Sequence, residues 1–264
     1  MTGYKDVDSN RELKKIASTI FSAGVNAVDP ERCVNRHLQV NAGTLRIGEA
    51  AFDLDRIKKL YLIGFGKASA VMARAVEAML GNRIDDGIII TKYGHSVPLT
   101  RCRVMEAGHP VPDENGARAT EALVDLISTS RAGDLILCMI SGGGSALTPA
   151  PVQGVDLADK QETTRLLLSC GADIHEINTI RKHLSYFKGG QLCRHAKGAA
   201  IVSLILSDVI GDNLDSIASG ATAPDSGTYG DCMGILARYN LIGAVPEAVC
   251  RHLSAGNRGP IGET

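Results

Sequence analysis

Residues 134–145 read Asp-Leu-Ile-Leu-Cys-Met-Ile-Ser-Gly-Gly-Gly-Ser, and this stretch decides the fold. Six apolar residues that break into glycines and hydroxyls are typical of a buried strand that ends in a loop. Glycine allows positive φ and close approach of a ligand, and successive backbone N–H groups that face one way can bind an anion. We therefore expect a phosphate or carboxylate cradle, with a flexible Gly/Ser linker as the alternative. The cradle residues are Ser141, Gly142, Gly143, Gly144 and Ser145.

Similar apolar runs alternate with helical patterns along most of the chain. Strands that are apolar on both faces, separated by amphipathic helices, indicate a parallel sheet covered on both sides. We expect an α/β fold, a doubly wound, Rossmann-like, mainly parallel sheet with helices on both faces, whose ligands bind beyond the carboxyl ends of the strands. The expected strands are 60–63, 87–91, 103–107, 135–140 and 200–206, and the main helices are 68–80, 115–127, 157–168 and 174–187.

The two ends of the chain differ from this alternation. The first forty residues predict two helices, the second starting at Asp29-Pro30-Glu31, and a short polar connection follows. No linker is evident before residue 245, so we expect one domain over 1–245. Residues 246–264 end in a turn-rich polar stretch and are predicted to be the truncated start of a following segment.

Composition excludes several classes of protein. The chain has 264 residues, is 44% hydrophobic and carries a formal net charge of −1, which gives no case for nucleic acid or an anionic membrane as partner. No apolar stretch approaches the roughly 20 residues of a membrane helix, and the N-terminus lacks a signal core. Seven scattered cysteines without a C-x-x-C pair indicate a reduced, cytoplasmic protein. Assembly into a homo-oligomer is left open.

The first strand ends in Gly64-Phe-Gly-Lys-Ala-Ser69, which resembles two phosphate motifs and satisfies neither. A P-loop needs Gly at 61 and Ser or Thr at 68, and the dinucleotide fingerprint needs Gly at 69. A Gly-x-Gly turn before a helix still places backbone donors near an anion. Lys67 is unfavourable at a helix start unless an anion meets it, although a solvated surface lysine is the alternative. Gly64, Gly66, Lys67 and Ser69 are therefore candidate site residues.

Two further strand ends carry polar side chains. His109 lies in a loop stiffened by two prolines, where it either binds substrate or packs within the loop, while Asp113 caps the next helix. Asp208 directly follows the 200–206 strand, where carboxylates of α/β enzymes are placed, and Asp212 is the better candidate for a helix cap. A carboxylate near a phosphate cradle holds Mg²⁺ or takes a proton from a hydroxyl.

One helix adds a stripe of polar side chains. Asn178, Arg181, Lys182 and Ser185 recur at helical spacing beside an apolar stripe. They either line the edge of a cleft or form an ordinary solvated face.

Taken together, these segments resemble the class II glycerate 2-kinases. The resemblance covers nearly the whole chain in family order, which is far more specific than one glycine loop. It implies ATP-dependent phosphorylation of D-glycerate at the 2-hydroxyl, giving 2-phosphoglycerate, with a divalent metal such as Mg²⁺. The matching segments are 64–69, 107–116, 141–146, 178–185, 188–190, 207–212 and 219–225.

The resemblance also carries roles over to single residues. The family's conserved lysine falls on Lys67, its aspartate on Asp208, and its Asn-Thr-x-Arg-Lys stretch on Asn178, Arg181 and Lys182. We expect the glycine loop to hold the ATP phosphates, Lys67 to stabilise transferred charge, Asp208 to activate the hydroxyl or hold Mg²⁺, and Arg181 to pair with the glycerate carboxylate.

Two other functions remain as alternatives. The family continues into a second domain and places its active site between the two, so 1–245 corresponds to its N-terminal domain, and the chain alone is not expected to hold the whole site. A non-catalytic fragment that binds nucleotide or a small acid is one alternative. Family members are often labelled hydroxypyruvate reductases, the other alternative, although Ser69 in place of the third glycine argues against it.

Overall fold

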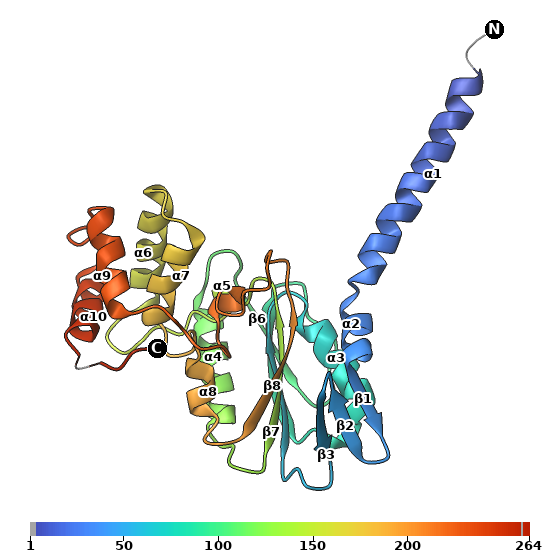
Figure 1. Cartoon of the computed structure of the whole chain (residues 1–264), viewed down its shortest axis with the longest axis horizontal. Coiled ribbons are helices and arrows are strands. Elements are labelled where there is room, and N and C mark those ends of the chain that lie inside the picture. Colours follow the sequence, from blue (N-terminus) through green and yellow to red (C-terminus); the bar gives the residue numbers. More distant parts are fainter. Residues whose placement is uncertain (1–3, 260) are drawn as a thin grey trace.

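A five-stranded parallel sheet forms the centre of the computed structural model, which describes residues 4–259 and 261–264 (Figure 1). Its strand order is β6-β5-β4-β7-β8. The chain enters this sheet at the central strand β4, adds β5 and β6 on one side, and then adds β7 and β8 on the other side. The order therefore reverses between β4 and β7, and ligands of such sheets bind at this switch point. The strands are β4 (Leu60–Phe65), β5 (Asp86–Lys92), β6 (Arg103–Ala107), β7 (Leu135–Ser141) and β8 (Ala200–Leu206).

Helices cover both faces of this sheet because its central strands are apolar on both sides. Every residue of β7 is buried, and alternate residues enter two different cores: Leu137 lies in one and Cys138 in the other. The first core includes α2 (Pro30–His37) and α3 (Ser69–Leu80), and the second includes α4 (Glu114–Ile127) and α8 (Gln191–His195). The predicted doubly wound α/β sheet is confirmed.

A small antiparallel sheet replaces the polar connection predicted before the first parallel strand. It consists of β1 (Leu38–Asn41), β2 (Thr44–Ile47) and β3 (Ala50–Asp53), and it buries Leu45 and Ile47 against the first core. The β1–β2 turn is Ala42-Gly43, with φ of +46° and +78°. The turns of such hairpins usually carry Asn-Gly or Asp-Gly, so Ala42 in the first position left no recognisable turn motif in the sequence.

A third core lies in a helical cluster beside one end of the sheet (Figure 1). The predicted boundary at residue 245 falls inside this cluster, because Val245 and Val249 are both buried in it. The helix predicted over 174–187 ends earlier, at His183. The cluster consists of α6 (Leu157–Ser169), α7 (Ile174–His183), α9 (Tyr229–Arg238) and α10 (Glu247–Asn257).

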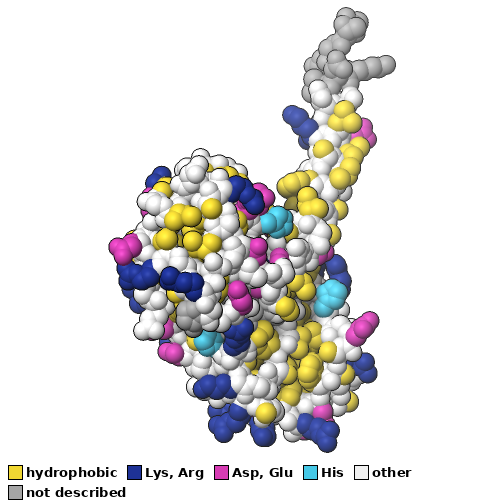
Figure 2. Space-filling model, turned by 60° about the vertical axis from the view of Figure 1, so that its left-hand side comes forward, with side chains coloured by type: hydrophobic (Ala, Val, Ile, Leu, Met, Phe, Trp, Pro, Cys, Tyr) yellow, Lys and Arg dark blue, Asp and Glu magenta, His cyan; other side chains and the backbone are white. Residues whose placement is uncertain are grey.

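The first helix, α1 (Tyr4–Ala27), projects from the opposite end of the molecule (Figure 1). Its apolar side chains are strongly exposed, for example Phe21 at 73%, and they form a band along the projecting helix (Figure 2). Within the described residues, no helix combines the length and apolar character that crossing a bilayer requires. Three short helices complete the part of the fold that the structure describes: η1 (Gly81–Arg83), α5 (Gly144–Leu147) and η2 (Ile217–Ser219).

Leu253 tests whether α10 belongs to the helical core. Its side chain is completely buried, so Leu253→Ala should lower the free energy of unfolding by about 2–5 kcal/mol in urea denaturation. Leu168 on α6 is 63% exposed, so the control Leu168→Ala should change it by less than about 0.5 kcal/mol. If Leu253→Ala lowered the free energy of unfolding as little as the control does, the packing of α10 into this core would be contradicted.

Candidate active site

The loops that follow β4 and β7 lock together at the switch point of the sheet. The Lys67 N–H donates to the carbonyl of Gly142 at 3.0 Å, and the Ala68 N–H donates to Ser141 Oγ at 2.9 Å. Gly66 has φ of +136°, and a Cβ there would lie 2.4 Å from the Ser141 carbonyl oxygen. Only glycine fits at this contact, and the glycine-rich segment is a fixed loop rather than a linker.

This loop has the backbone donors that an anion cradle requires. Within the described part of the chain, four successive residues donate no backbone hydrogen bond to the protein: Gly142, Gly143, Gly144 and Ser145. Backbone N–H groups that stay unpaired in a partly buried loop are costly unless water or a ligand accepts from them. The arrangement fits the predicted cradle, whose ligand stays a prediction.

Lys67 and Asp208 face one cavity of about 300 Å³, which Ser141, Gly142 and Ser207 also line. A Cβ placed on Gly142 would lie 3.5 Å from Asp208 Oδ1 and 3.9 Å from Lys67 Cε, so both side chains approach the same glycine. The predicted convergence of Lys67 and Asp208 on a common crevice is therefore confirmed in geometry. Their chemical roles stay predictions.

His109 also lies against this loop, next to Gly143. A Cβ on Gly143 would lie 2.9 Å from His109 Cδ2 and 3.2 Å from Lys67 Cγ. Burial and the positive charge of Lys67 lower the pKa of His109, which favours the neutral imidazole at pH 7. Asp113 instead accepts a hydrogen bond from the Gly116 N–H at 2.9 Å and caps α4, as predicted.

Two predicted site residues shape the loop without facing a cavity. Gly64 lies inside β4, where a Cβ would come within 2.7 Å of the Met139 carbonyl oxygen. Ser69 is completely buried, and its hydroxyl donates to the carbonyls of Gly66 at 2.7 Å and Ile90 at 3.1 Å. The structure therefore gives Gly64 and Ser69 structural contacts rather than access to a ligand.

The segment after β8 begins with an exposed loop. Ser207 Oγ accepts a hydrogen bond from the Val209 N–H at 3.0 Å, and Ile210 at the tip is 98% exposed. The prediction that Asp212 caps a helix is wrong: Asp212 has φ of +48°, and Ser216 occupies the N-cap of η2. The sequence Asp-Asn suggested a cap because such residues favour both caps and left-handed turns.

A buried hydroxyl that sequence reasoning missed connects the glycine loop to α7. Ser219 Oγ lies 2.5 Å from Ser145 Oγ and 3.2 Å from Asn178 Oδ1. Ala218 and Ser219 both have positive φ, which strains non-glycine residues and often marks functional sites. No sequence pattern reveals such a conformation, so although the matching segment 219–225 contains Ser219, this residue was not singled out as a candidate.

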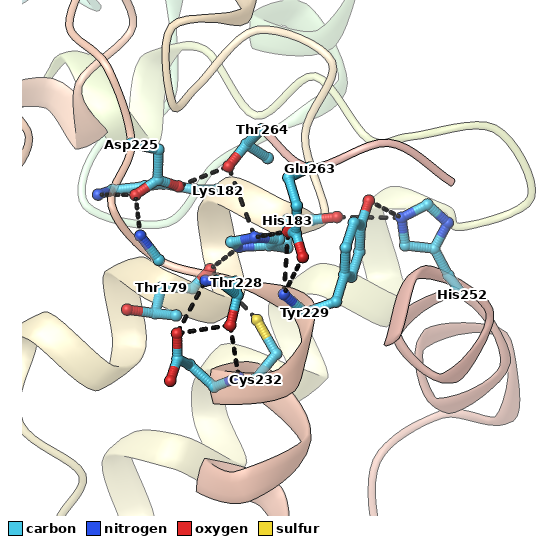
Figure 3. A network of polar contacts seen from close by, with 12 residues as sticks. Thr179, Lys182, His183, Asp225, Thr228, Tyr229, Cys232, His252, Glu263 and Thr264 are labelled. Atoms are coloured by element: carbon cyan, nitrogen blue, oxygen red, sulfur yellow. Dashed lines mark hydrogen bonds and ion pairs between the residues drawn. The ribbon is translucent and has the colours of Figure 1, made fainter. Parts of the chain in front are cut away.

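Asn178 and Lys182 line a second polar cavity of about 370 Å³, which shares no lining residue with the Lys67 cavity. Lys182 is buried and forms an ion pair with Asp225 at 2.9 Å (Figure 3) and another with Asp215 at 3.4 Å. Burial alone would raise the pKa of Asp225, but hydrogen bonds from Thr264, Gly227 and Lys182 outweigh it and lower that pKa. The charge of Lys182 is thus already compensated by protein carboxylates.

Few side chains among the described residues are candidates for metal binding. No cluster of three or more His, Cys, Asp or Glu side chains that could hold an ion occurs among the described residues. Asp208 is the carboxylate that borders the Lys67 cavity. A single carboxylate fits Mg²⁺ better than a metal that needs a full protein cage, because Mg²⁺ keeps waters and takes ligands from phosphates.

Comparison with known proteins places the chain in a family. The model of a family described as "Domain of unknown function (DUF4147)" matches residues 16–254. The chain is 42% identical to a glycerate 2-kinase of Pyrococcus horikoshii, over 96% of this chain and 56% of the relative. It is 39% identical to a putative hydroxypyruvate reductase of Agrobacterium vitis, over 97% of this chain and 54% of the relative.

A solved structure agrees with these relatives. The crystal structure of a glycerate kinase from Thermotoga maritima matches with a TM-score of 0.79 at 39% identity, over 92% of this chain and 55% of that one. The chain thus spans about half the length of the relatives it matches. The resemblance inferred from the motifs is confirmed: the chain belongs to the DUF4147 family, the family of the glycerate kinases.

Proposed function

We propose that this chain serves ATP-dependent phosphorylation of D-glycerate at its 2-hydroxyl, the activity that the names of its relatives suggest. The observation that carries the proposal is the approach of Lys67 and Asp208 to Gly142 at the switch point of the sheet. Phosphoryl transfer depends mainly on positioning and on stabilising charge, and this site offers a cation, a carboxylate and unpaired backbone donors together.

Each group has a distinct task in this proposal. The backbone N–H groups from Gly142 to Ser145 hold phosphate oxygens of ATP, and the Lys67 ammonium stabilises negative charge that develops during transfer. Asp208 accepts the proton of the 2-hydroxyl or holds Mg²⁺, which when bound neutralises phosphate charge. Neutral His109, beside Gly143 and Lys67, orients a substrate oxygen without adding charge.

Two competing functions have specific support. The match to about half of each relative's length favours a binding module whose chemistry needs further residues. The name of the Agrobacterium vitis relative favours hydroxypyruvate reduction. Against reduction, the buried Ser69 occupies the position of the third fingerprint glycine, where a dinucleotide fold needs close helix–strand packing.

The cysteines bear on the cellular setting. All seven cysteines are free thiols, which supports a reducing, cytoplasmic compartment. The absence of nucleic-acid and membrane partners stays a prediction, and assembly into a homo-oligomer stays open.

Product analysis separates the three functions. If this chain holds enough of the site for turnover, incubation with MgATP and D-glycerate yields a phosphate ester at the 2-position, identified by ³¹P and ¹H NMR. Calorimetric binding of ATP without any turnover would instead support the binding module. Oxidation of NADH in the presence of hydroxypyruvate would support the reductase.

Lys67→Ala should lower kcat by about 100-fold or more with an unchanged fold, because a preorganised charge at the transferred group is lost. The control is Lys59→Ala at the opposite end of β4, an exposed lysine whose removal should leave kcat within about twofold. If this chain alone has no turnover, the same test applies to the corresponding lysine of the Thermotoga maritima enzyme. Near-normal turnover without the lysine would remove Lys67 from the mechanism.

Lys67→Met should raise the pKa of His109, because it removes a positive charge that disfavours the imidazolium form. The measurement is an NMR titration of the His109 ring protons, with Lys59→Met as the control that leaves the pKa in place. An unshifted His109 would show that Lys67 points away from the imidazole in solution.

A further inference from the structure

Ser145, the last residue of the predicted cradle, is held at two of its atoms. Its carbonyl accepts a hydrogen bond from Lys188 Nζ at 2.9 Å, and its hydroxyl lies 2.5 Å from Ser219 Oγ. Lys188 is 1% exposed and Ser219 is completely buried, so water does not compete for either contact. Residues 43 and 74 positions further along the chain therefore fix the end of the glycine loop.

The ammonium group of Lys188 is fully used within the protein. An ammonium has three hydrogens, and besides the Ser145 carbonyl Lys188 Nζ donates to the carbonyl and the hydroxyl of Thr148. These three acceptors take all three hydrogens, so Lys188 has none left for a ligand. Lys188 thus holds the turn 145–148 in place, whereas Lys67 faces the cavity.

The direction of the hydrogen bonds decides what the Ser145 hydroxyl can do. Ser219 Oγ donates its single hydrogen to Asn178 Oδ1 at 3.2 Å. In the contact between the two serines, Ser145 is then the donor and Ser219 the acceptor. The hydroxyl hydrogen of Ser145 is therefore used within the protein, and Ser145 can donate to a bound anion only through its backbone N–H.

The two residues that hold Ser145 belong to segments that are bonded to each other. The N–H of Gly189, the residue after Lys188, donates to the Ser219 carbonyl at 3.0 Å. Ser219 has φ of +58°, a conformation that costs a non-glycine residue free energy and persists only where its surroundings hold it. The contacts of Lys188 and Ser219 with Ser145 therefore act as one unit, which we call the Ser145 clamp.

We infer that the Ser145 clamp positions the cradle: by fixing Ser145, Lys188 and Ser219 hold the free N–H groups from Gly142 to Ser145 in the arrangement that binds an anion. Both are positioning residues, since neither has a hydrogen available for a ligand. A loop that is ordered before binding binds more tightly than one that must be ordered by its ligand. The inference rests on the proposed function for the identity of the anion, a phosphate group of ATP.

Calorimetric binding of inorganic phosphate and of MgATP to the full chain tests the clamp. Ser219→Ala should raise the Kd of both about tenfold, the usual effect of one lost hydrogen bond. Ser130→Ala is the matched control, because Ser130 is 2% exposed and its hydroxyl also contacts two groups, the carbonyls of Ile127 and Ala196. Both variants should lower Tm, and only Ser219→Ala should weaken anion binding.

A double-mutant comparison separates the clamp from a direct contact between the Ser145 hydroxyl and the anion. Ser145→Ala and Ser219→Ala remove the same hydrogen bond, so each should raise Kd by the same factor. The double variant should then bind no more weakly than either single variant. If the Ser145 hydroxyl donated to the anion, Ser145→Ala would have the larger effect.

Lys188→Met extends the test to the carbonyl of Ser145. It should raise Kd about tenfold or more, because the turn 145–148 loses all three hydrogen bonds from the ammonium. Lys160→Met is the matched control: Lys160 is 6% exposed and donates to the carbonyls of Pro149 and Leu184, outside the cradle. The control should keep Kd within about twofold. If Lys188→Met does not fold, the serine variants decide.

The inference is overturned if neither phosphate nor MgATP shifts the amide NMR signals of residues 142–145 in the wild-type chain, or if Ser219→Ala binds both as tightly as Ser130→Ala does. A chain that binds MgATP with the expected dependence on Ser219 and does not phosphorylate D-glycerate would retain the clamp and reject the proposed function. The two failures are thus distinguishable.

Discussion

The contact between the ends of β4 and β7 positions the rest of the candidate site. At Gly66 the backbone comes so close to Ser141 that no side chain fits, and the Lys67 N–H closes the contact on Gly142. This approach fixes where Lys67 leaves the sheet and where the glycine loop turns. Since both strands are central and hydrogen-bonded on both sides, the contact belongs to the most rigid part of the molecule.

The sequence predicts the sheet well because its central strands carry an unbroken apolar signal. β4, β5 and β7 are buried almost throughout, and such runs bounded by glycine are distinctive. The four-residue strands β1, β2 and β3 were missed, because each buries too few residues for a periodic pattern. The packing of α10 against α9 and α6 was also invisible, since it depends on contacts between distant segments.

Site residues were predicted where the backbone imposes their type. Gly66 and Gly143 have positive φ, and a Cβ on Gly142 would lie close to Asp208 and Lys67. Polar residues at the ends of buried strands gather at one edge of the sheet. Whether a polar side chain is already paired within the protein or can bind a ligand depends on contacts between segments that are distant in the sequence. Arg181 and Lys182 are consecutive cations on one helix, and only the structure shows that Lys182 has carboxylate partners whereas Arg181 has none among the described residues.

Because β8 lies at the edge of the sheet and β4 at its centre, the backbone that carries Asp208 is held less firmly than the backbone that carries Lys67. Lys67 follows the inner strand β4, whereas Asp208 follows the edge strand β8, which is hydrogen-bonded to one neighbouring strand. After Asp208 the chain forms an exposed loop with Ile210 at its tip. Border strands and exposed loops open most easily in native proteins. Fluctuations that change the gap between ammonium and carboxylate therefore arise mainly on the aspartate side, and amide exchange should be faster after Leu206 than after Phe65.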